Sequence, residues 1–100
     1  MYIGTYTINT TAPSDISVKE NITATGYGLA DLMKFSIKNF EYKKEYVDEG
    51  ETQKEHTGLI AQEVETIYPE AVIYRSDNLK AIDYNKLIPL IIKSIQDLAL

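Results

Sequence analysis

Few side chains in this sequence can do covalent chemistry, and two of them stand five residues apart near its start. Ser14 lies between Pro13 and Asp15, and Lys19 follows a short mixed stretch. A serine hydroxyl needs a base before it can attack a carbonyl, and lysine can be that base only when it is neutral. Taken alone, Ser14-Asp15 is typical of a turn or a helix cap, and Lys19 of a solvated surface lysine.

Other polar residues give weaker indications of a site. His56 opens a predicted strand, where a structural role is the ordinary one, and Gln62 and Glu63 open a predicted helix, where they would satisfy caps or bond across subunits. The carboxylates of segment 41–55 show no metal-ligand order and indicate a solvated acidic surface. With no cysteine and one histidine, the chain is expected to bind neither a metal nor another cofactor.

Size and charge restrict the class of protein. One hundred residues suit one small domain, and a net charge of −5 without a basic cluster argues against nucleic acid or anionic lipid as a partner. No apolar run of about 20 residues is present, so no membrane span is expected. Residues 1–13 are uncharged and rich in threonine, and residues 2–8 alternate like a strand. We therefore expect 1–13 to end an upstream segment and 14–100 to form the domain.

The pattern of apolar residues and breakers predicts an α+β domain of short strands and helices. Helices are predicted over residues 29–34 and 61–68, and strands over about 36–42, 56–60, 71–74 and 79–82. The polar segment 43–55 is predicted to be a loop or hairpin tip. A long helix is predicted from about Tyr84 to the end, capped by Asp83.

The predicted C-terminal helix is apolar on more than one side. One stripe contains Leu87, Ile91, Ile95 and Leu98, and a second contains Ile88 and Ile92. A domain of this size can cover one side of such a helix, and copies of the chain could cover the other. An isoleucine-rich seam is compatible with a three-stranded bundle. From the pattern alone, a central core helix explains the sequence equally well.

Three stretches resemble motifs of a known family. They are SDISVKENI (14–22), HTGLIAQEV followed by YPEAV (56–64 and 68–72), and AIDYNKLIPL (81–90). They are similar to S-D-x-R-L-K-x-N-I, to H-x-G-x-I-A-Q-E-V with F-P-E-A-V, and to V-D-Y-x-x-L-x-P-L. These motifs belong to the self-processing intramolecular chaperone domain at the C-termini of phage endosialidases, tailspikes, neck appendages and tail fibres. The same module occurs in the eukaryotic myelin regulatory factor.

The resemblance implies a homotrimer that guides folding of the upstream fibre and then releases itself by one serine-type cut. The cut would fall between Pro13 and Ser14, with Ser14 as nucleophile and Lys19 as base. Supporting roles would fall to Asp15, Asn21, Gln62 and Glu63. The trimer helix would contribute Leu87, Ile88, Ile91, Ile95 and Leu98. The expected place of action is the host cytoplasm during virion assembly, and the domain would be absent from the mature virion.

This sequence departs from the family pattern at three positions beside the expected cut. Ser17 and Val18 replace the usual arginine and leucine, so a partner carboxylate would need another donor. Pro13 has no N–H and a fixed φ, which alters how the Pro13–Ser14 peptide bond is presented to the Ser14 hydroxyl. One alternative is therefore a non-cleaving trimerisation module retained in the fibre. Another is an unrelated monomeric α+β adaptor that binds a partner through its apolar helix.

Overall fold

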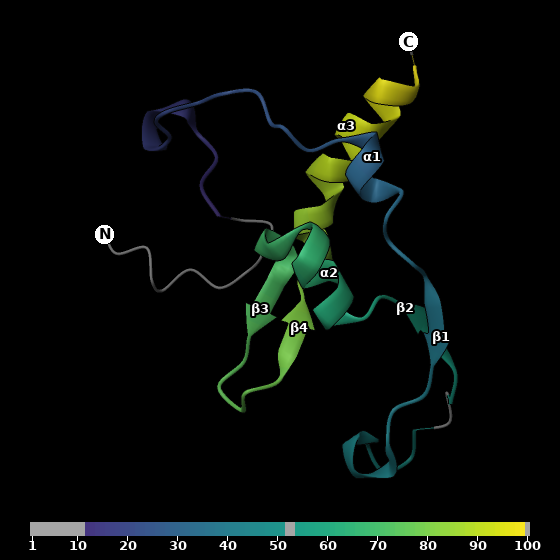
Figure 1. Ribbon diagram of the computed structural model, residues 1–100. Coiled ribbons are helices and arrows are strands. Elements are labelled where there is room, and N and C mark those ends of the chain that lie inside the picture. Colours follow the sequence, from purple (N-terminus) through teal and green to yellow (C-terminus); the bar gives the residue numbers. More distant parts are fainter. Residues whose placement is uncertain (1–11, 52–53, 100) are drawn as a thin grey trace.

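Three α-helices and two β-hairpins follow one another along residues 12–51 and 54–99, the part of the chain that the computed structural model describes (Figure 1). The α-helices are α1 (Leu29–Leu32), α2 (Ala61–Ile67) and α3 (Ile88–Leu98). The strands are β1 (Lys38–Phe40), β2 (His56–Gly58), β3 (Val72–Tyr74) and β4 (Lys80–Ile82). The predicted α+β class is confirmed. The strand predicted over residues 2–8 lies outside the described residues.

Each pair of strands forms its own antiparallel hairpin. In the first, Lys38 lies opposite Gly58 and Phe40 opposite His56. In the second, Val72 lies opposite Ile82. Each strand is three residues long, shorter than predicted, and each sheet has two strands among the described residues. The segment predicted as a loop joins β1 to β2, and its described residues include a short 3-10 turn (Lys44–Tyr46).

The hydrophobic core lies where α2, the turn after it and the C-terminal helix meet. Its buried members in the described residues are Val64, Tyr68, Ala71, Leu87 and Leu90. Partly buried apolar side chains surround them: Leu32, Phe35, Leu59, Ile67, Val72 and Ile82. Leu87 was predicted for the trimer seam, but only 6% of it is exposed in its own protomer. Leu87 belongs to the core cluster of this protomer with Val64 and Leu90, a position that the period of the apolar residues alone does not reveal.

The C-terminal helix starts with a tight turn. Asp83 accepts a hydrogen bond from the Asn85 N–H at 3.1 Å, which confirms it as the cap. The next residues form a 3-10 turn (Tyr84–Leu87) before α3 begins at Ile88. Pro89 is tolerated there because the first-turn N–H groups have no intrahelical partner. Among the described residues, no helix is both long and apolar enough to cross a membrane.

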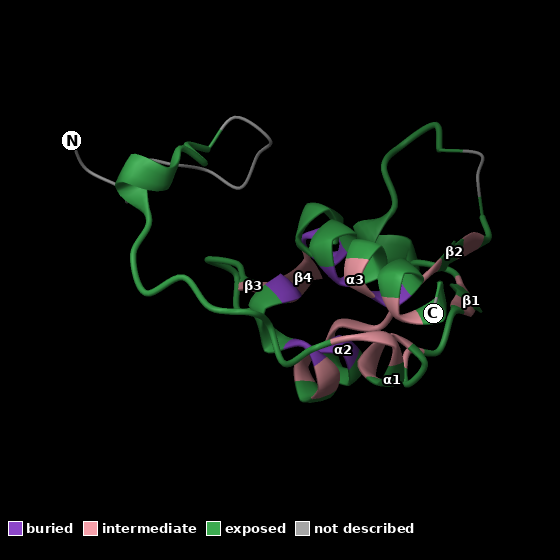
Figure 2. Cartoon of the chain, turned by 90° about the horizontal axis from the view of Figure 1, so that it is seen from above, coloured by how far each residue is buried: buried purple, intermediate pink, exposed green. Residues whose placement is uncertain are grey.

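Two segments project from this body. Residues 12–27, hereafter the arm, leave α1 and run away from the core, and the β1–β2 hairpin extends at another side (Figure 1). The radius of gyration is 16.5 Å, against about 13 Å for a compact chain of this length. Figure 2 shows the arm exposed along nearly all its length. The arm is therefore held to the body mainly where it joins α1.

Tyr68 connects the core to the base of the arm. Its ring lies edge-on to the Tyr27 ring, with centroids 4.7 Å apart. Burial, with the neighbouring Glu70 carboxylate, raises the pKa of Tyr68 to about 12. Because the folded-state pKa lies above the ordinary value of 10.0, the fold favours the neutral phenol. This stabilisation is complete below pH 10 and is lost as the pH rises from about 10 to 12.

We predict that the stability of the Tyr68→Phe variant falls less at alkaline pH than the stability of the wild type. Between pH 8 and pH 11 the free energy of unfolding of the wild type should fall by about 1.4 kcal/mol more than that of the variant, because pH 11 lies above the ordinary pKa of 10.0 but below the folded-state pKa of about 12. Urea unfolding at pH 8 and pH 11 measures the difference. Tyr46→Phe, at an exposed ring of the β1–β2 loop, is the control and should retain the wild-type fall. Equal falls for wild type and Tyr68→Phe would contradict the prediction.

Candidate active site

A single 3-10 turn (Ile16–Val18) shapes the arm around the predicted site. Asp15 caps it, with its side chain accepting a hydrogen bond from the Ser17 N–H at 2.9 Å. The Lys19 N–H closes the turn by donating to the Ile16 carbonyl at 3.1 Å, and Lys19 itself is extended. The chain therefore bends between Ser14 and Lys19. A straight α-helix would direct side chains five positions apart to different faces.

The bend brings the Ser14 hydroxyl and the Lys19 amine together. Lys19 Nζ lies 2.8 Å from Ser14 Oγ and donates to it. The same separation would serve a neutral amine that accepts the hydroxyl proton. Both residues are exposed in the single chain, so water reaches the pair. The geometry of a serine–lysine pair is present, whereas the burial that would favour a neutral lysine is not.

The structure places the other predicted site residues differently. Asn21 lies two positions after Lys19 with a left-handed backbone (φ 53°), a conformation that asparagine tolerates. Gln62 and Glu63 occupy the first turn of α2, and Glu63 pairs with Lys38 of β1 at 3.3 Å. No hydrogen bond or ion pair joins either α2 residue to the Ser14–Lys19 pair in the part of the chain that the structure describes.

His56 belongs to an aromatic cluster at the β1–β2 hairpin. Its ring stacks on Phe40 and meets the edge of Tyr42, with centroids 5.7 and 5.1 Å away. This is a structural position, as the sequence indicated. The described residues hold no group of three or more histidine, aspartate or glutamate side chains that could bind a metal.

Ser17, at the position where the family motif has arginine, donates to the Asp15 carboxylate. Hydrogen bonds from the side chain and backbone N–H of Ser17 hold the pKa of Asp15 below its ordinary value of 3.8. The carboxylate next to Ser14 is therefore satisfied within the turn itself.

Two sets of apolar side chains are left uncovered. On the arm, Ile16, Val18 and Ile22 are 60–75% exposed. On α3, the exposed set is Ile88, Ile91, Ile92, Ile95 and Leu98. Four of these α3 residues were predicted for the seam, and the fifth, Ile92, was predicted for the second apolar stripe of the helix. Bare apolar surface on two separate elements is typical of an unfilled interface.

Comparison with known proteins places the chain in a family. Residues 14–73, more than half the chain, match the peptidase family described as chaperone of endosialidase. The chain belongs to the chaperone of endosialidase family. The matched region contains Ser14, Lys19 and the motifs around α2, and it ends before α3. The resemblance seen in the sequence is thus confirmed.

One curated relative of this chaperone of endosialidase domain is a eukaryotic protein. Sixty-five residues are 42% identical to Myelin regulatory factor homolog 1 of Caenorhabditis elegans. The aligned part covers 60% of this chain but 7% of that relative, so the chain spans a small fraction of the relative's length. Membership of the family implies a serine-peptidase type of self-processing domain.

The capped turn leads to a prediction about Asp15. In an NMR pH titration its carboxyl midpoint should lie below 3.8, and Ser17→Ala should move it upward by removing the side-chain hydrogen bond. The pKa is lowered because these hydrogen bonds favour the charged carboxylate. Their contribution to the stability of the turn is therefore lost as the pH falls through the lowered pKa. Ser36→Ala, at a serine beside Lys38, is the control and should leave the midpoint unchanged. An unshifted midpoint in the wild type would contradict the geometry of the turn.

Proposed function

We propose that this domain trimerises, assists folding of the phage tailspike or fibre segment before it, and then cuts the chain between Pro13 and Ser14. The observation that carries the proposal is the 2.8 Å contact between Lys19 Nζ and Ser14 Oγ. It occurs in a member of a family described as both a peptidase and a chaperone. The proposed place of action is the host cytoplasm during virion assembly, before the domain is released.

The proposed cut is an acyl transfer followed by hydrolysis. Neutral Lys19 takes the Ser14 hydroxyl proton while Oγ attacks the carbonyl carbon of Pro13. The Pro13–Ser14 C–N bond breaks as the lysine returns the proton to the Ser14 nitrogen, which leaves an ester on Oγ. Water then hydrolyses the ester to a Pro13 carboxylate and a free Ser14 hydroxyl. The chain is its own substrate, so effective molarity replaces substrate binding.

This chemistry requires the arm to be covered. Lysine loses its proton at neutral pH when its amine is removed from water. Lys19 is exposed in the single chain, but it stands among the bare side chains of Ile16, Val18 and Ile22. Packing these three against neighbouring protomers would bury apolar area and desolvate the amine in one step. Assembly would thereby activate the pair and delay the cut until the trimer exists.

The exposed stripe of α3 supports a threefold association. Its members are all isoleucine or leucine, and isoleucine-rich seams favour three strands. Three gathered helices would raise the local concentration of three upstream ends to roughly millimolar. This matters for an intertwined fibre because its contacts are between chains and carry a large entropic cost. Removal of the domain after folding would leave the fibre kinetically trapped.

The cleavage proposal predicts distinct products. Incubation of the 100-residue chain should yield a fragment that starts at Ser14, as read by mass spectrometry. Ser14→Ala should abolish the cut, and Lys19→Arg should slow it by about 10²–10⁴-fold, because arginine keeps the charge but cannot act as a base. Lys44→Arg in the β1–β2 loop is the matched control and should cut normally. Cutting of Lys19→Arg at the wild-type rate would exclude the lysine base, and an uncut wild-type trimer would support a retained, non-cleaving module.

The assembly proposal is tested on α3. Ile95→Lys should convert the trimer to monomer in sedimentation experiments and weaken association by at least about 100-fold, since one lysine per chain would enter an apolar seam. The protomer should keep its circular dichroism spectrum because Ile95 is 60% exposed there. Met33→Lys, at an exposed position just after α1, is the control and should remain trimeric. A monomeric wild type, or a trimeric Ile95→Lys, would contradict the seam.

A further inference from the structure

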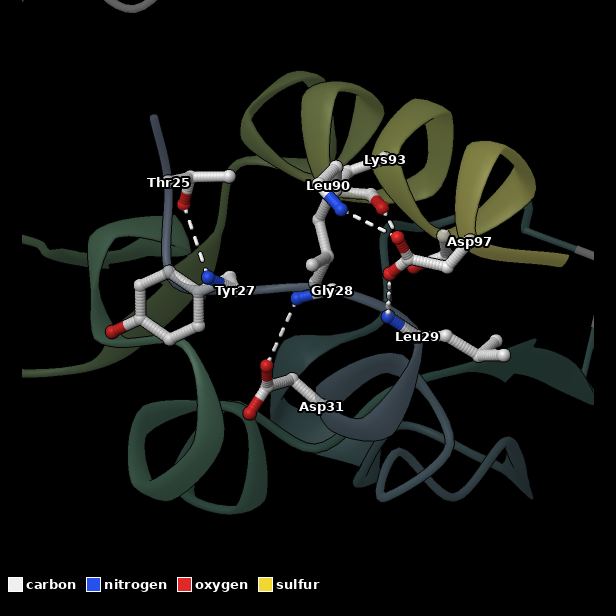
Figure 3. Close-up of polar contacts among 9 residues, drawn as sticks. Thr25, Tyr27, Gly28, Leu29, Asp31, Leu90, Lys93 and Asp97 are labelled. Carbon is white, nitrogen blue, oxygen red and sulfur yellow. Dashed lines mark hydrogen bonds and ion pairs between the residues drawn. The ribbon is translucent and has the colours of Figure 1, made fainter. Parts of the chain in front are cut away.

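The base of the arm is fastened to the body at three successive residues, hereafter the root: Tyr27, Gly28 and Leu29 (Figure 3). The Tyr27 ring packs edge-on against Tyr68 at 4.7 Å, and its N–H donates to Thr25 Oγ1 at 3.1 Å. The Gly28 N–H donates to the Asp31 carboxylate at 3.0 Å. The direction in which the arm leaves the body is set here.

Asp97 joins the root to the C-terminal helix. Its Oδ2 accepts a hydrogen bond from the Leu29 N–H at 3.0 Å, across 68 positions of sequence. Its Oδ1 pairs with Lys93, one turn earlier on α3, at 2.5 Å (Figure 3). These hydrogen bonds hold the pKa of Asp97 below 3.8, so the carboxylate is charged at neutral pH. A charged acceptor makes this contact stronger than a neutral one would be.

Gly28 provides the space for this contact. A Cβ at position 28 would overlap the Asp97 carboxylate. The Gly28 backbone is extended (φ −174°), which any residue can adopt, so the requirement is for room and not for unusual dihedral angles. The close approach of α1 to α3 therefore depends on the absence of a side chain at the root.

The two sides of α3 face different partners. Leu90 and Ser94 are buried against the body, and Asp97 continues that side toward the root. Ile95 and Leu98 lie between and beyond them on the exposed stripe. One helix thus presents the proposed seam on one side and the anchor of the arm on the other.

We propose that Asp97 is a positioning residue that couples the assembly of α3 to the placement of the Ser14–Lys19 pair. The inference rests on the proposed function. The Asp97 carboxylate holds the root against α3. When three α3 helices associate, each arm would therefore leave the trimer in the same direction. Between Lys19 and the root, every residue of the arm is exposed, so a loosened root would let the arm sample many directions. Small misplacements of reacting groups are costly to rate.

The test compares Asp97→Ala with Asp97→Asn in the 100-residue chain. Asp97→Ala removes the acceptor for the Leu29 N–H and should slow cleavage roughly tenfold. Asp97→Asn keeps a side-chain oxygen at the same place and should restore most of the rate. Trimer content by sedimentation should be unchanged in both. In a non-cleaving Ser14→Ala background, the Leu29 amide should exchange faster with Asp97→Ala and recover with Asp97→Asn.

Asp31→Ala is the matched control, because it removes the other carboxylate at the start of the same helix without touching α3. Equal slowing by Asp31→Ala and Asp97→Ala would show that only fraying of α1 matters, and would overturn the inference. Gly28→Ala offers a second way to displace the carboxylate if Asp97→Ala fails to fold, and it should also slow cleavage. If the wild type and Asp97→Ala are cleaved at the same rate, the positioning role of Asp97 is refuted and the proposed function is not. Failure of the wild type to cut refutes the proposed function and this role together.

Discussion

The burial of one side of the C-terminal helix in its own protomer is the constraint on which the rest of the structure depends. Leu87 and Leu90 enter the protomer's own core beside Val64 and Tyr68, and this fixes the rotation of α3 about its axis. Once that rotation is fixed, the isoleucines on the other arc must face outward, and Asp97 must face α1. The exposed apolar stripe and the contact that holds the base of the arm therefore both follow from the way α3 packs in its own protomer. Neither could change without disturbing the core.

Much of the fold follows from local sequence signals. Pro69 ends α2, Asp83 caps the turn before α3, and the polar segment after Tyr42 becomes a loop, all as the residue types indicate. The strands are shorter than predicted because alternation of residue types shows which residues favour a strand but not where the pairing between two strands ends. Leu87 lies in the core of its own protomer, which the sequence did not indicate because the polar residues of this widely apolar helix cover only a narrow arc.

The residues of the candidate site also differ in how far the sequence indicates them. The proximity of Ser14 and Lys19 is set within six residues, so a local motif could indicate it. The role of Ser17 beside Asp15 is also local, although the departure from the family pattern concealed it. By contrast, Asp97 and Leu29 are 68 positions apart, and only the hydrogen bond between them in the structure shows that they interact. A lysine four residues before an aspartate indicates a helical ion pair and nothing about a distant amide.

The small core has a consequence for how the chain becomes folded at all. Five apolar residues are buried among those that the structure describes, and both sheets are two-stranded. A lone protomer with so small a core has a small free energy of unfolding. If copies associate through α3, the apolar area that they cover adds to the stability of each chain, so folding and association are linked. The melting temperature of the domain would then rise with protein concentration, and on dilution it would fall back to that of the lone protomer.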